Sequence, residues 1–507
     1  MNFLDLLYGA EILAQNGNPN VSGVEYDSRR VKPGCVFVAM RGESSDGNKF
    51  IDKAIAAGAV AVVSDSASEK PRGTVAWAQV PHGRRALARL SANFYRRPAE
   101  RLAVTGITGT NGKSTSAFLV EAILQAAGRK SALVGTIEYH VAGKILPAPH
   151  TTPEALDLNQ LLAEAIDQGA SEALMEVSSH ALAQQRVYGI PFDVAIFTNL
   201  TRDHLDYHHT MDEYFAAKQI LFEGCGAAAP RVAVLNIDDE YGQKLVKVSK
   251  KNSAEVVTYG LAQGDFHAEN VKITLRGTRF DLVSPTGTIP LFSPLIGKVN
   301  VYNILAAAGA AYGRKCAPEA IARGVEALAR VPGRFERVDC GQPFTVVVDY
   351  AHTDDALRNL TALAKEFVQQ AGQKGRVITV FGCGGDRDRA KRPLMGEAAG
   401  RGSDFVVLTS DNPRSEEPLA IMNDALVGLQ RSEVRYTMET DRRTAIAAAV
   451  HEAAPGDIVL IAGKGHEKVQ ILRDRSVPFD DVQVAREVLR ESGFVCEAAN
   501  IAAGKHS

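Results

Sequence analysis

The chain has 507 residues, of which 45% are hydrophobic and 23% are charged, a composition typical of a globular protein with about three domains. The formal net charge is -2, so no overall field attracts nucleic acid or an anionic membrane, and we expect neither as a partner. No apolar run reaches the ~18 residues of a membrane span, and the N-terminus lacks the basic start of a signal peptide. We expect a monomer in the cytoplasm without membrane insertion.

The cysteines are few and none of them forms a C-x-x-C pair. This spacing argues against a disulfide framework and against a thiolate zinc site. The six positions are Cys35, Cys225, Cys316, Cys340, Cys383 and Cys496.

Turn-forming residues at Arg96-Arg97-Pro98 and Val331-Pro332-Gly333 divide the chain into three predicted domains, 1–98, 99–331 and 332–507. The second and third alternate strand-like apolar runs with helical stretches, which is typical of a mostly parallel sheet covered by helices. We therefore predict an α/β protein with a smaller N-terminal α/β domain, a central P-loop mononucleotide-binding domain and a C-terminal Rossmann-like domain. The predicted strands are 35–40, 102–105, 132–135, 173–177, 194–198, 232–236, 344–348, 377–381, 405–409 and 458–462.

The second segment contains a glycine-rich loop, VTGITGTNGKST, that runs from Val104 to Thr115 between a predicted strand and a predicted helix. Backbone N–H groups at such a loop bind phosphate oxygens, and the helix N-terminus favours negative charge. Lys113 is expected at the β- and γ-phosphates and the hydroxyl of Ser114 or Thr115 at Mg²⁺. Ile107 stands where the usual motif has its first glycine. A plain glycine-rich turn is the alternative, but the Lys-Ser-Thr run favours ATP.

Two further predicted strand ends carry candidate cation ligands. Glu176 lies in MEVSSH, and His204 lies in TNLTRDHLD. A carboxylate and an imidazole beside a phosphate loop are plausible ligands of a hard cation. The alternative for His204 is a hydrogen-bonded surface histidine.

Lys218 lies in a predicted helix, on the same face as the apolar Tyr214, Leu221 and Phe222. A charged lysine is costly to bury unless it is paired or chemically altered. From these residues alone we expect its ammonium to extend along the apolar surface to solvent.

Four predicted strands of the third segment run into polar tails, in VVVDYAHTDD, VFGCGGDRDRAKR, LTSDNPR and IAGKGHE. Ligands of open α/β sheets bind beyond the carboxyl ends of the strands. Arginine grips carboxylates and acidic groups take an ammonium, so these loops predict a pocket for a zwitterionic amino acid and phosphate. Solvated loops with incidental charge are the alternative.

Taken together, the motifs resemble those of the Mur ligases, ATP-dependent amide-forming enzymes of peptidoglycan synthesis, over essentially the full length. Within that family the chain is most similar to members that add the third peptide residue to UDP-N-acetylmuramoyl-L-alanyl-D-glutamate. Asp354, where proline is usual, and His150 depart from the family pattern. The matching motifs are TGTNGKST (108–115), TTP (151–153), MEVSSHAL (175–182), TNLTRDHLDYH (198–208), YFAAKQILF (214–222), GKVNVYN (297–303), PGRFE (332–336), DYAHT (349–353) and GKGHE (463–467).

The resemblance implies a role for each matching position. It implies ATP contacts at Gly109, Thr110, Asn111, Gly112, Lys113, Ser114, Thr115, Asn303, Arg334 and His352. It implies contacts to the UDP-muramoyl-dipeptide at Ser28, Thr151, Thr152, Ser178, Gln184 and Arg186. It implies two Mg²⁺ sites with ligands from Ser114, Glu176, His204 and a carbamylated Lys218 (N6-carboxylysine), which reverses the expectation of a solvated Lys218. Catalytic roles fall to Lys113, Lys218, Glu176 and His204.

The resemblance also implies an amino-acid pocket and a substrate. The Asp-Asn-Pro-Arg tetrad at 411–414 is the form associated with meso-diaminopimelate rather than L-lysine, because Arg414 and Arg387 would clamp the second carboxylate. The implied reaction passes through an acyl phosphate and releases ADP and phosphate. The alternatives are a sibling ligase that adds lysine, one that adds glutamate to folate, and a nucleotide-switched binding protein. The pocket residues are Arg387, Asp411, Asn412, Pro413, Arg414, Gly463 and Glu467.

Overall fold

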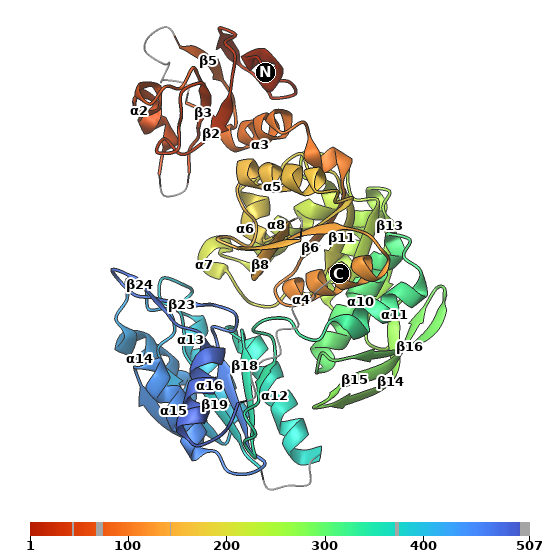
Figure 1. Ribbon diagram of the computed structural model, residues 1–507, viewed down its shortest axis with the longest axis vertical. Coiled ribbons are helices and arrows are strands. Elements are labelled where there is room, and N and C mark those ends of the chain that lie inside the picture. The colour runs from red at the N-terminus through yellow and green to blue at the C-terminus, as the bar shows by residue number, and fades with distance from the viewer. Residues whose placement is uncertain (43–44, 67–74, 142, 371–374, 497–507) are drawn as a thin grey trace.

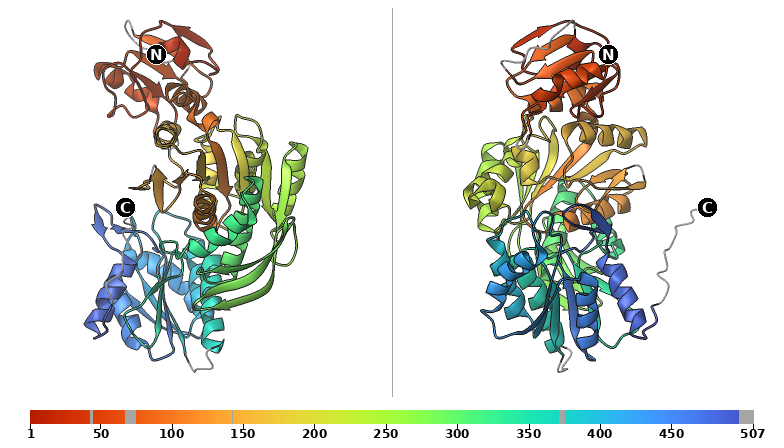
Figure 2. Two further views of the ribbon diagram at one scale, coloured as in Figure 1. Left: turned by 45° about the vertical axis from the view of Figure 1, so that its right-hand side comes forward. Right: turned by 90° about the vertical axis from the view of Figure 1, so that its left-hand side faces the viewer.

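The computed structural model describes residues 1–42, 45–66, 75–141, 143–370 and 375–496. Three α/β bodies follow one another in chain order along the longest axis of the molecule (Figure 1). Figure 2 shows the central body between the other two, with the third beneath it. Within the described ranges, no helix combines the length and the apolar character needed to cross a bilayer.

The first body is built on a five-stranded sheet in the order β1-β5-β4-β3-β2, parallel except for β1 at the edge. The strand predicted at 35–40 is confirmed as β3. Arg96 and Arg97 both have positive φ, of 60° and 51°, so the chain turns sharply after the last helix. The elements are α1 (Phe3–Leu6), β1 (Ala14–Asn16), β2 (Gly23–Glu25), β3 (Cys35–Ala39), η1 (Gly47–Phe50), α2 (Ile51–Ala56), β4 (Ala61–Ser64), β5 (Ala76–Gln79), α3 (Gly83–Phe94) and η2 (Pro98–Arg101).

The second body has an eight-stranded sheet in the order β13-β12-β11-β6-β10-β7-β8-β9, in which only β8 runs against the other strands and pairs antiparallel with β7 and β9. One apolar core packs α4, α10 and α11 on one face, and another packs α5, α8 and α9 on the other. The five strands predicted here are confirmed. The elements are β6 (Ala103–Thr108), α4 (Lys113–Ala126), β7 (Ser131–Val134), β8 (Glu138–Val141), β9 (Lys144–Pro147), α5 (Ala155–Asp167), β10 (Glu172–Glu176), α6 (Ser179–Ala183), β11 (Phe192–Phe197), α7 (Leu205–His208), α8 (Met211–Glu223), β12 (Val232–Asn236), α9 (Glu240–Lys251), β13 (Glu255–Tyr259), α10 (Lys298–Gly313) and α11 (Pro318–Ala327).

An antiparallel sheet that the sequence analysis did not predict lies beside this body. It consists of β14 (His267–Thr274), β15 (Gly277–Ser284) and β16 (Gly287–Ser293). Ile273 and Leu275 at its tip pack against the core of the third body, and Arg337 donates a hydrogen bond to the Leu275 carbonyl at 3.2 Å. The sheet therefore contacts the third body directly.

The third body has a six-stranded sheet in the order β17-β18-β22-β19-β20-β21, parallel except for β17. The four strands predicted here are confirmed, and helices cover both faces. The elements are β17 (Glu336–Val338), β18 (Thr345–Asp349), α12 (Asp354–Gln370), β19 (Val377–Phe381), α13 (Lys391–Gly402), β20 (Phe405–Thr409), α14 (Pro418–Leu429), β21 (Arg435–Glu439), α15 (Arg442–Glu452), β22 (Ile458–Ala462), β23 (Val469–Ile471), β24 (Ser476–Pro478) and α16 (Asp481–Glu491).

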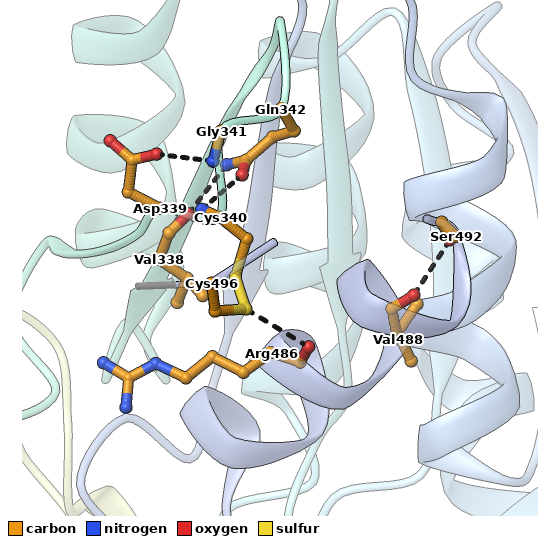
Figure 3. Close-up of a disulfide and its surroundings, with 9 residues drawn as sticks. All are labelled: Val338, Asp339, Cys340, Gly341, Gln342, Arg486, Val488, Ser492 and Cys496. Atoms are coloured by element: carbon orange, nitrogen blue, oxygen red, sulfur yellow. Dashed lines mark hydrogen bonds between the residues drawn. A yellow bond between two sulfur atoms is a disulfide. The ribbon is translucent and has the colours of Figure 1, made fainter. Parts of the chain in front are cut away.

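One disulfide joins Cys340, just after β17, to Cys496, beyond α16 (Figure 3). The side chain of Gln342 holds the turn at Cys340, because it accepts from the Cys340 N–H at 2.7 Å and donates to the Val338 carbonyl at 2.8 Å. The expectation of no disulfide framework therefore needs correction to a single bridge. Cysteine spacing does not reveal such pairing, since the partners are 156 residues apart.

His140 on β8 lies between two carboxylates. Its Nδ1 is 2.7 Å from Glu121 Oε2 and its Nε2 is 2.9 Å from Glu138 Oε1. Burial opposes the charge, but the hydrogen bonds and charges of Glu121 and Glu138 outweigh it and raise the pKa of His140 to about 9. A protonated histidine therefore joins β8 to α4.

We predict that this histidine makes stability depend on pH. Its folded pKa lies above the unfolded value of ~6.5, so the stabilisation is complete below that pH and is lost as pH rises through the folded pKa. The full effect corresponds to about 3 kcal/mol. His140→Gln should lower the unfolding temperature clearly at low pH and little at high pH, as followed by calorimetry. The exposed His451→Gln is the control, and a pH-independent loss in H140Q contradicts the prediction.

Candidate functional site

The glycine-rich loop connects β6 to α4 at the carboxyl edge of the central sheet, and its geometry requires glycine twice. Gly109 has φ of 147° and Gly112 has φ of 87°. A Cβ at Gly109 would overlap Thr198 Oγ1, and one at Gly112 would overlap Asn303 Oδ1. The loop therefore packs too closely against Thr198 and Asn303 to accept any residue but glycine at these two positions, and it leads into the N-terminus of α4, where backbone N–H groups favour an anion.

Ile107, the departure from the usual motif, belongs to the strand rather than to the loop. It is fully buried in the core, and β6 pairs it with Glu176 of β10 and Ile196 of β11. The strand continues to Thr108, so the loop proper begins at Gly109. An apolar residue fits this position because the chain there is still a central strand.

The segment 198–204, which follows β11, is hydrogen-bonded to the phosphate loop. The Asn199 carbonyl accepts from the Thr110 N–H at 2.8 Å, and the Asn199 side chain accepts from the Asn111 N–H at 2.9 Å. Thr198 Oγ1 donates to the Asn111 carbonyl at 2.6 Å. These bonds hold the loop against the segment that carries His204.

A half-buried lysine, Lys113, and a buried one, Lys218, meet at one carbonyl of the loop. Lys113 Nζ donates to the Gly109 and Thr110 carbonyls at 3.0 and 2.9 Å, and Lys218 Nζ donates to the Gly109 carbonyl at 2.9 Å. Lys218 is 1% exposed, so the expectation that its ammonium reaches solvent is wrong. Burial, and then the charge of Lys113, hold the pKa of Lys218 well below its ordinary value.

Both carboxylate oxygens of Glu176, at the end of β10, accept hydrogen bonds from the same residue. Thr136 donates from its N–H to Oε1 at 2.8 Å and from its hydroxyl to Oε2 at 2.9 Å. The Thr136 hydroxyl also lies 3.0 Å from that of Thr151. The sequence analysis missed Thr136, whose only signal was its place directly after the strand β7.

His204 is half-buried with φ of 55°, directly before α7. Its ring centroid lies 4.8 Å from that of His180 and 6.0 Å from that of Tyr214, over which Lys218 Nζ also lies. Aromatic rings therefore connect His204 to Lys218.

Asp203, which the sequence analysis missed, joins the central and third bodies. It is 6% exposed and lies 3.7 Å from Lys391 Nζ and 3.9 Å from His352 Nε2. Burial would raise the pKa of Asp203, but the electrostatic interactions with His204, Lys391 and His352 outweigh it and hold the pKa below its ordinary value.

In the described part of the chain, no three His, Cys, Asp or Glu side chains come together as a metal site. The predicted ligand set contains two such side chains, Glu176 and His204. A cation here would therefore also need oxygen from the Ser114 hydroxyl, from phosphate or from a carbamate.

Four of the residues predicted for the UDP-muramoyl-dipeptide lie together. The Ser178 N–H donates to Thr152 Oγ1 at 3.1 Å. Arg186 donates to the Thr152 carbonyl at 2.9 Å and to Gln184 Oε1 at 2.7 Å. Thr151 directly precedes Thr152 in the chain, and its hydroxyl contacts Thr136.

Ser28 lies in the first body, in the loop after β2, and is 9% exposed. Its neighbours along the chain contact the central body, because Tyr26 donates to Asp157 of α5 at 2.7 Å and Arg30 lies 3.3 Å from the same carboxylate. Glu154 adds a second link, with Arg84 and Arg186 both 3.1 Å away. The sequence analysis did not single out these contacts between the two bodies.

The predicted amino-acid pocket lies at the carboxyl ends of β19, β20 and β22. Arg414 has φ of 52° and donates to the Gly385 carbonyl at 2.8 Å. The side chains of Arg414 and Arg387 are near neighbours, because a Cβ at Gly384 would lie 3.0 Å from Arg414 Nη1 and 3.8 Å from Arg387 Cγ. Burial, and then the charge of Arg387, lower the pKa of Arg414. Gly463, with φ of 116°, approaches Asp411 so closely that a Cβ would lie 2.8 Å from its Oδ2.

A buried ion pair is hydrogen-bonded to the backbone at two of these strand ends. Arg442 and Asp481 are fully buried and 2.7 Å apart. Arg442 also donates to the Ala462 carbonyl at 3.0 Å and to the Ser410 carbonyl at 3.4 Å. The ion pair therefore holds the ends of β20 and β22 immediately before Asp411 and Gly463.

The remaining predicted ATP residues come from two bodies. Asn303 of α10 lies against the phosphate loop at Gly112. The Arg334 guanidinium lies 4.7 Å from the ring centroid of Tyr350, and burial and the charge of Lys391 lower the pKa of His352 to about 4. The third body therefore brings cationic and aromatic side chains towards the central body.

Comparison with known proteins shows which protein family the sequence matches. Models described as "Mur ligase family, catalytic domain", "Mur ligase middle domain" and "Mur ligase, glutamate ligase domain" match residues 20–95, 107–311 and 333–465. The UDP-N-acetylmuramoyl-L-alanyl-D-glutamate–2,6-diaminopimelate ligase of Solibacter usitatus is 55% identical over 475 residues, which cover 94% of each chain.

The chain belongs to the Mur ligase family. A Geobacter metallireducens protein with the same name as the Solibacter relative is 46% identical, over 93% of this Mur ligase and 94% of its own length. A solved structure of a ligase of that name has a TM-score of 0.67 and 35% identity, and the match covers 98% of this chain and all of the other. The three-body α/β architecture is therefore that of a Mur ligase.

We predict that Gly109→Ala abolishes nucleotide binding. The methyl group would overlap Thr198 Oγ1 and displace the loop from segment 198–204. ADP affinity, measured by calorimetric titration, should fall at least ~100-fold, the effect of losing two or more phosphate hydrogen bonds. Gly128→Ala is the matched control, since φ is also positive there but nothing lies within 4 Å of the added atom. Unchanged ADP affinity in G109A would show that the loop does not hold the phosphates.

Proposed function

We propose that this Mur ligase joins meso-2,6-diaminopimelate to the D-glutamate of UDP-N-acetylmuramoyl-L-alanyl-D-glutamate, converting ATP to ADP and phosphate. The observation that carries the proposal is that this chain is 55% and 46% identical to two ligases named for that reaction. The structure supports it with a phosphate loop that requires glycine and with two neighbouring arginine side chains, Arg387 and Arg414. The proposed domains are 1–98 for the UDP-substrate, 99–331 for ATP and 332–507 for the amino acid. A cytoplasmic location and a monomeric state stay predictions.

In the proposed reaction, a carboxylate oxygen of the glutamate side chain attacks the γ-phosphorus, and ADP leaves. The amine of diaminopimelate then attacks the acyl carbon, and phosphate leaves with the electron pair of the broken C–O bond. Lys113 is proposed to offset the repulsion between carboxylate and triphosphate, and its position in the phosphate loop, where it donates to the Gly109 and Thr110 carbonyls, supports this role. Asn303, Arg334 and His352 are proposed to contact the nucleotide.

We further propose Mg²⁺ sites between the phosphate loop and Glu176. The donor chemistry fits, since Ser114 is buried at the start of α4, and Glu176 and His204 lie beside the same loop. When bound, Mg²⁺ supplies Lewis-acid stabilisation of the transferring phosphoryl group. Lys218 would contribute as a carbamate, and its lowered pKa favours the neutral amine that reacts with CO₂.

The acceptor is proposed to bind where the first and central bodies meet. The contiguous side chains of Thr152, Ser178 and Arg186, with Thr151 and Gln184 beside them, would hold the peptide portion. Ser28 would contact the uridine nucleotide. Because Thr136 touches both Thr151 and Glu176, it is placed to couple acceptor binding to the cation site.

The amino acid is proposed to bind between the third body's strand ends, with Asp411, Asn412, Pro413, Gly463 and Glu467 around it. Arg387 and Arg414 lie close together, and their mutual repulsion would be relieved by a carboxylate between them. Lysine has no second carboxylate, and its binding would leave the arginine charges uncompensated. This asymmetry favours diaminopimelate over lysine.

The direct test of the proposed function is the amino-acid dependence of ADP release. The chain is incubated with ATP, Mg²⁺ and the UDP-linked dipeptide, and meso-diaminopimelate, L-lysine or no amino acid is added. Sustained ADP release should require the dipeptide and diaminopimelate together. Release with lysine would favour the lysine-adding alternative, release without either acceptor would indicate a nucleotide switch, and AMP as a product would contradict the acyl phosphate.

Arg414→Asn should relax the preference for diaminopimelate. Asparagine tolerates the left-handed backbone at this position, so the substitution removes the guanidinium and leaves the turn intact. We expect the KM for diaminopimelate to rise about 10- to 100-fold while that for the dipeptide is unchanged. Arg473→Asn, at an exposed arginine on the β23–β24 turn, is the control. Equal KM values for R414N and wild type would remove Arg414 from the pocket.

Lys218→Ala should lose most activity, with partial recovery on addition of a short carboxylate such as acetate. The added carboxylate would occupy the place of the carbamate oxygens. Isotope-labelled bicarbonate should produce a carbamate signal in the NMR spectrum of the wild type that the variant lacks. Lys244→Ala is a matched control, because that lysine also lies over a tyrosine ring, 4.2 Å from the Tyr241 centroid. Wild-type activity in K218A would contradict the carbamate role.

A further inference from the structure

Lys464 is a fully buried lysine directly after β22, and it has no role in the site described so far. Its side chain is 0% exposed. Its ammonium group donates to Asn412 Oδ1 at 3.0 Å, to Glu467 Oε2 at 3.1 Å and to the Val469 carbonyl at 2.7 Å. Since an ammonium has three hydrogens, these acceptors use all of them. Lys464 therefore has no donor left for a ligand.

The contact with Lys464 fixes the orientation of the Asn412 amide. Asn412 Oδ1 also accepts from the Ile471 N–H at 2.9 Å, so two donors point at this atom. The amide must then present its nitrogen on the opposite side, where Nδ2 donates to Glu467 Oε2 at 2.7 Å. A flipped amide would place its NH₂ against two donors, which is unfavourable.

The same contacts fix the carboxylate of Glu467. Oε2 accepts from both Lys464 and Asn412, while Oε1 has no protein hydrogen bond in the described ranges. The Glu467 side chain is 29% exposed, so its free oxygen is accessible to a ligand. One oxygen is thus held by the protein, and the other is left for an ammonium group. Asn412 is itself 2% exposed, and the second hydrogen of its Nδ2 has no acceptor among the described residues.

We propose that Lys464 is a positioning residue for the amino-acid substrate. It orients Asn412 so that its amide N–H faces the carboxylate of a zwitterion, and it orients Glu467 so that its free oxygen faces the α-amino group. The inference rests on the proposed function, because it assigns these two side chains to the incoming amino acid. Lys464 acts through them and touches no substrate. The short β23–β24 hairpin completes the arrangement, since Val469 and Ile471 supply backbone partners for Lys464 and Asn412.

The test is Lys464→Met, which keeps the length of the side chain and removes its charge and donors. Without Lys464 the amide of Asn412 and the carboxylate of Glu467 lose their fixed orientation. We expect the KM for diaminopimelate to rise about 10- to 100-fold, the effect of losing charged hydrogen bonds. The KM values for ATP and the dipeptide should stay within about threefold of wild type. Lys468→Met is the matched control, because that neighbouring lysine is 61% exposed and pairs with Asp480 away from the pocket.

Thermal unfolding and ADP titration establish that the variants are folded. If K464M does not fold, Lys464→Gln replaces it, since glutamine keeps an N–H donor for Asn412 and is neutral, and the same selective rise in the amino-acid KM is expected. A diaminopimelate KM within threefold of wild type, or an equal rise in all three KM values, would overturn the proposal. Failure of the wild type to join any amino acid would instead overturn the proposed function, so the two failures are distinguishable.

Discussion

The site depends on the close contact between the phosphate loop and segment 198–204. The loop approaches the segment so closely that Gly109 has no room for a side chain. Several hydrogen bonds of Thr110 and Asn111 hold the two together, and the same segment continues into Asp203 and His204. Asp203 then contacts Lys391 and His352 of the third body. A single chain of short-range contacts thus runs from the nucleotide site across the boundary between the bodies.

Buried charges also hold the loops of the third body that form the proposed amino-acid pocket. The buried ion pair of Arg442 and Asp481 holds the ends of β20 and β22. Lys464 donates hydrogen bonds to Asn412 and Glu467, in the loops that follow these strands. Each buried cation is fully paired, which is the condition for placing charge in a protein interior. Arg414 differs from them, because it donates to the Gly385 carbonyl, has no ion pair among the described residues, and has a pKa lowered by burial and by the charge of Arg387.

The residues that the sequence could not reveal share one property: their partners are distant in the chain. Thr136 has no motif of its own and becomes significant only because β7 and β10 are adjacent and bring it to Glu176. Asp203 meets Lys391 across two bodies, and Cys340 meets Cys496 after 156 residues. Lys218 was misjudged from helical periodicity, because an apolar helix face does not tell whether the sheet covers it completely. In the folded protein this helix face is covered, and Lys218 has no path to solvent.

The sequence by itself determined the strand and helix pattern, the phosphate loop and the polar tails of the strands, because these features depend on neighbours within a few residues. The strands predicted at 232–236, 377–381, 405–409 and 458–462 match β12, β19, β20 and β22 at both ends, since each is a short, mainly apolar and almost wholly buried run. Only the tertiary structure decided how Lys113 and Lys218 share a carbonyl, how Glu176 is held and how Lys464 orients its neighbours. Those contacts arise from the pairing order of the strands, which brings distant loops to one sheet edge and cannot be read from local pattern.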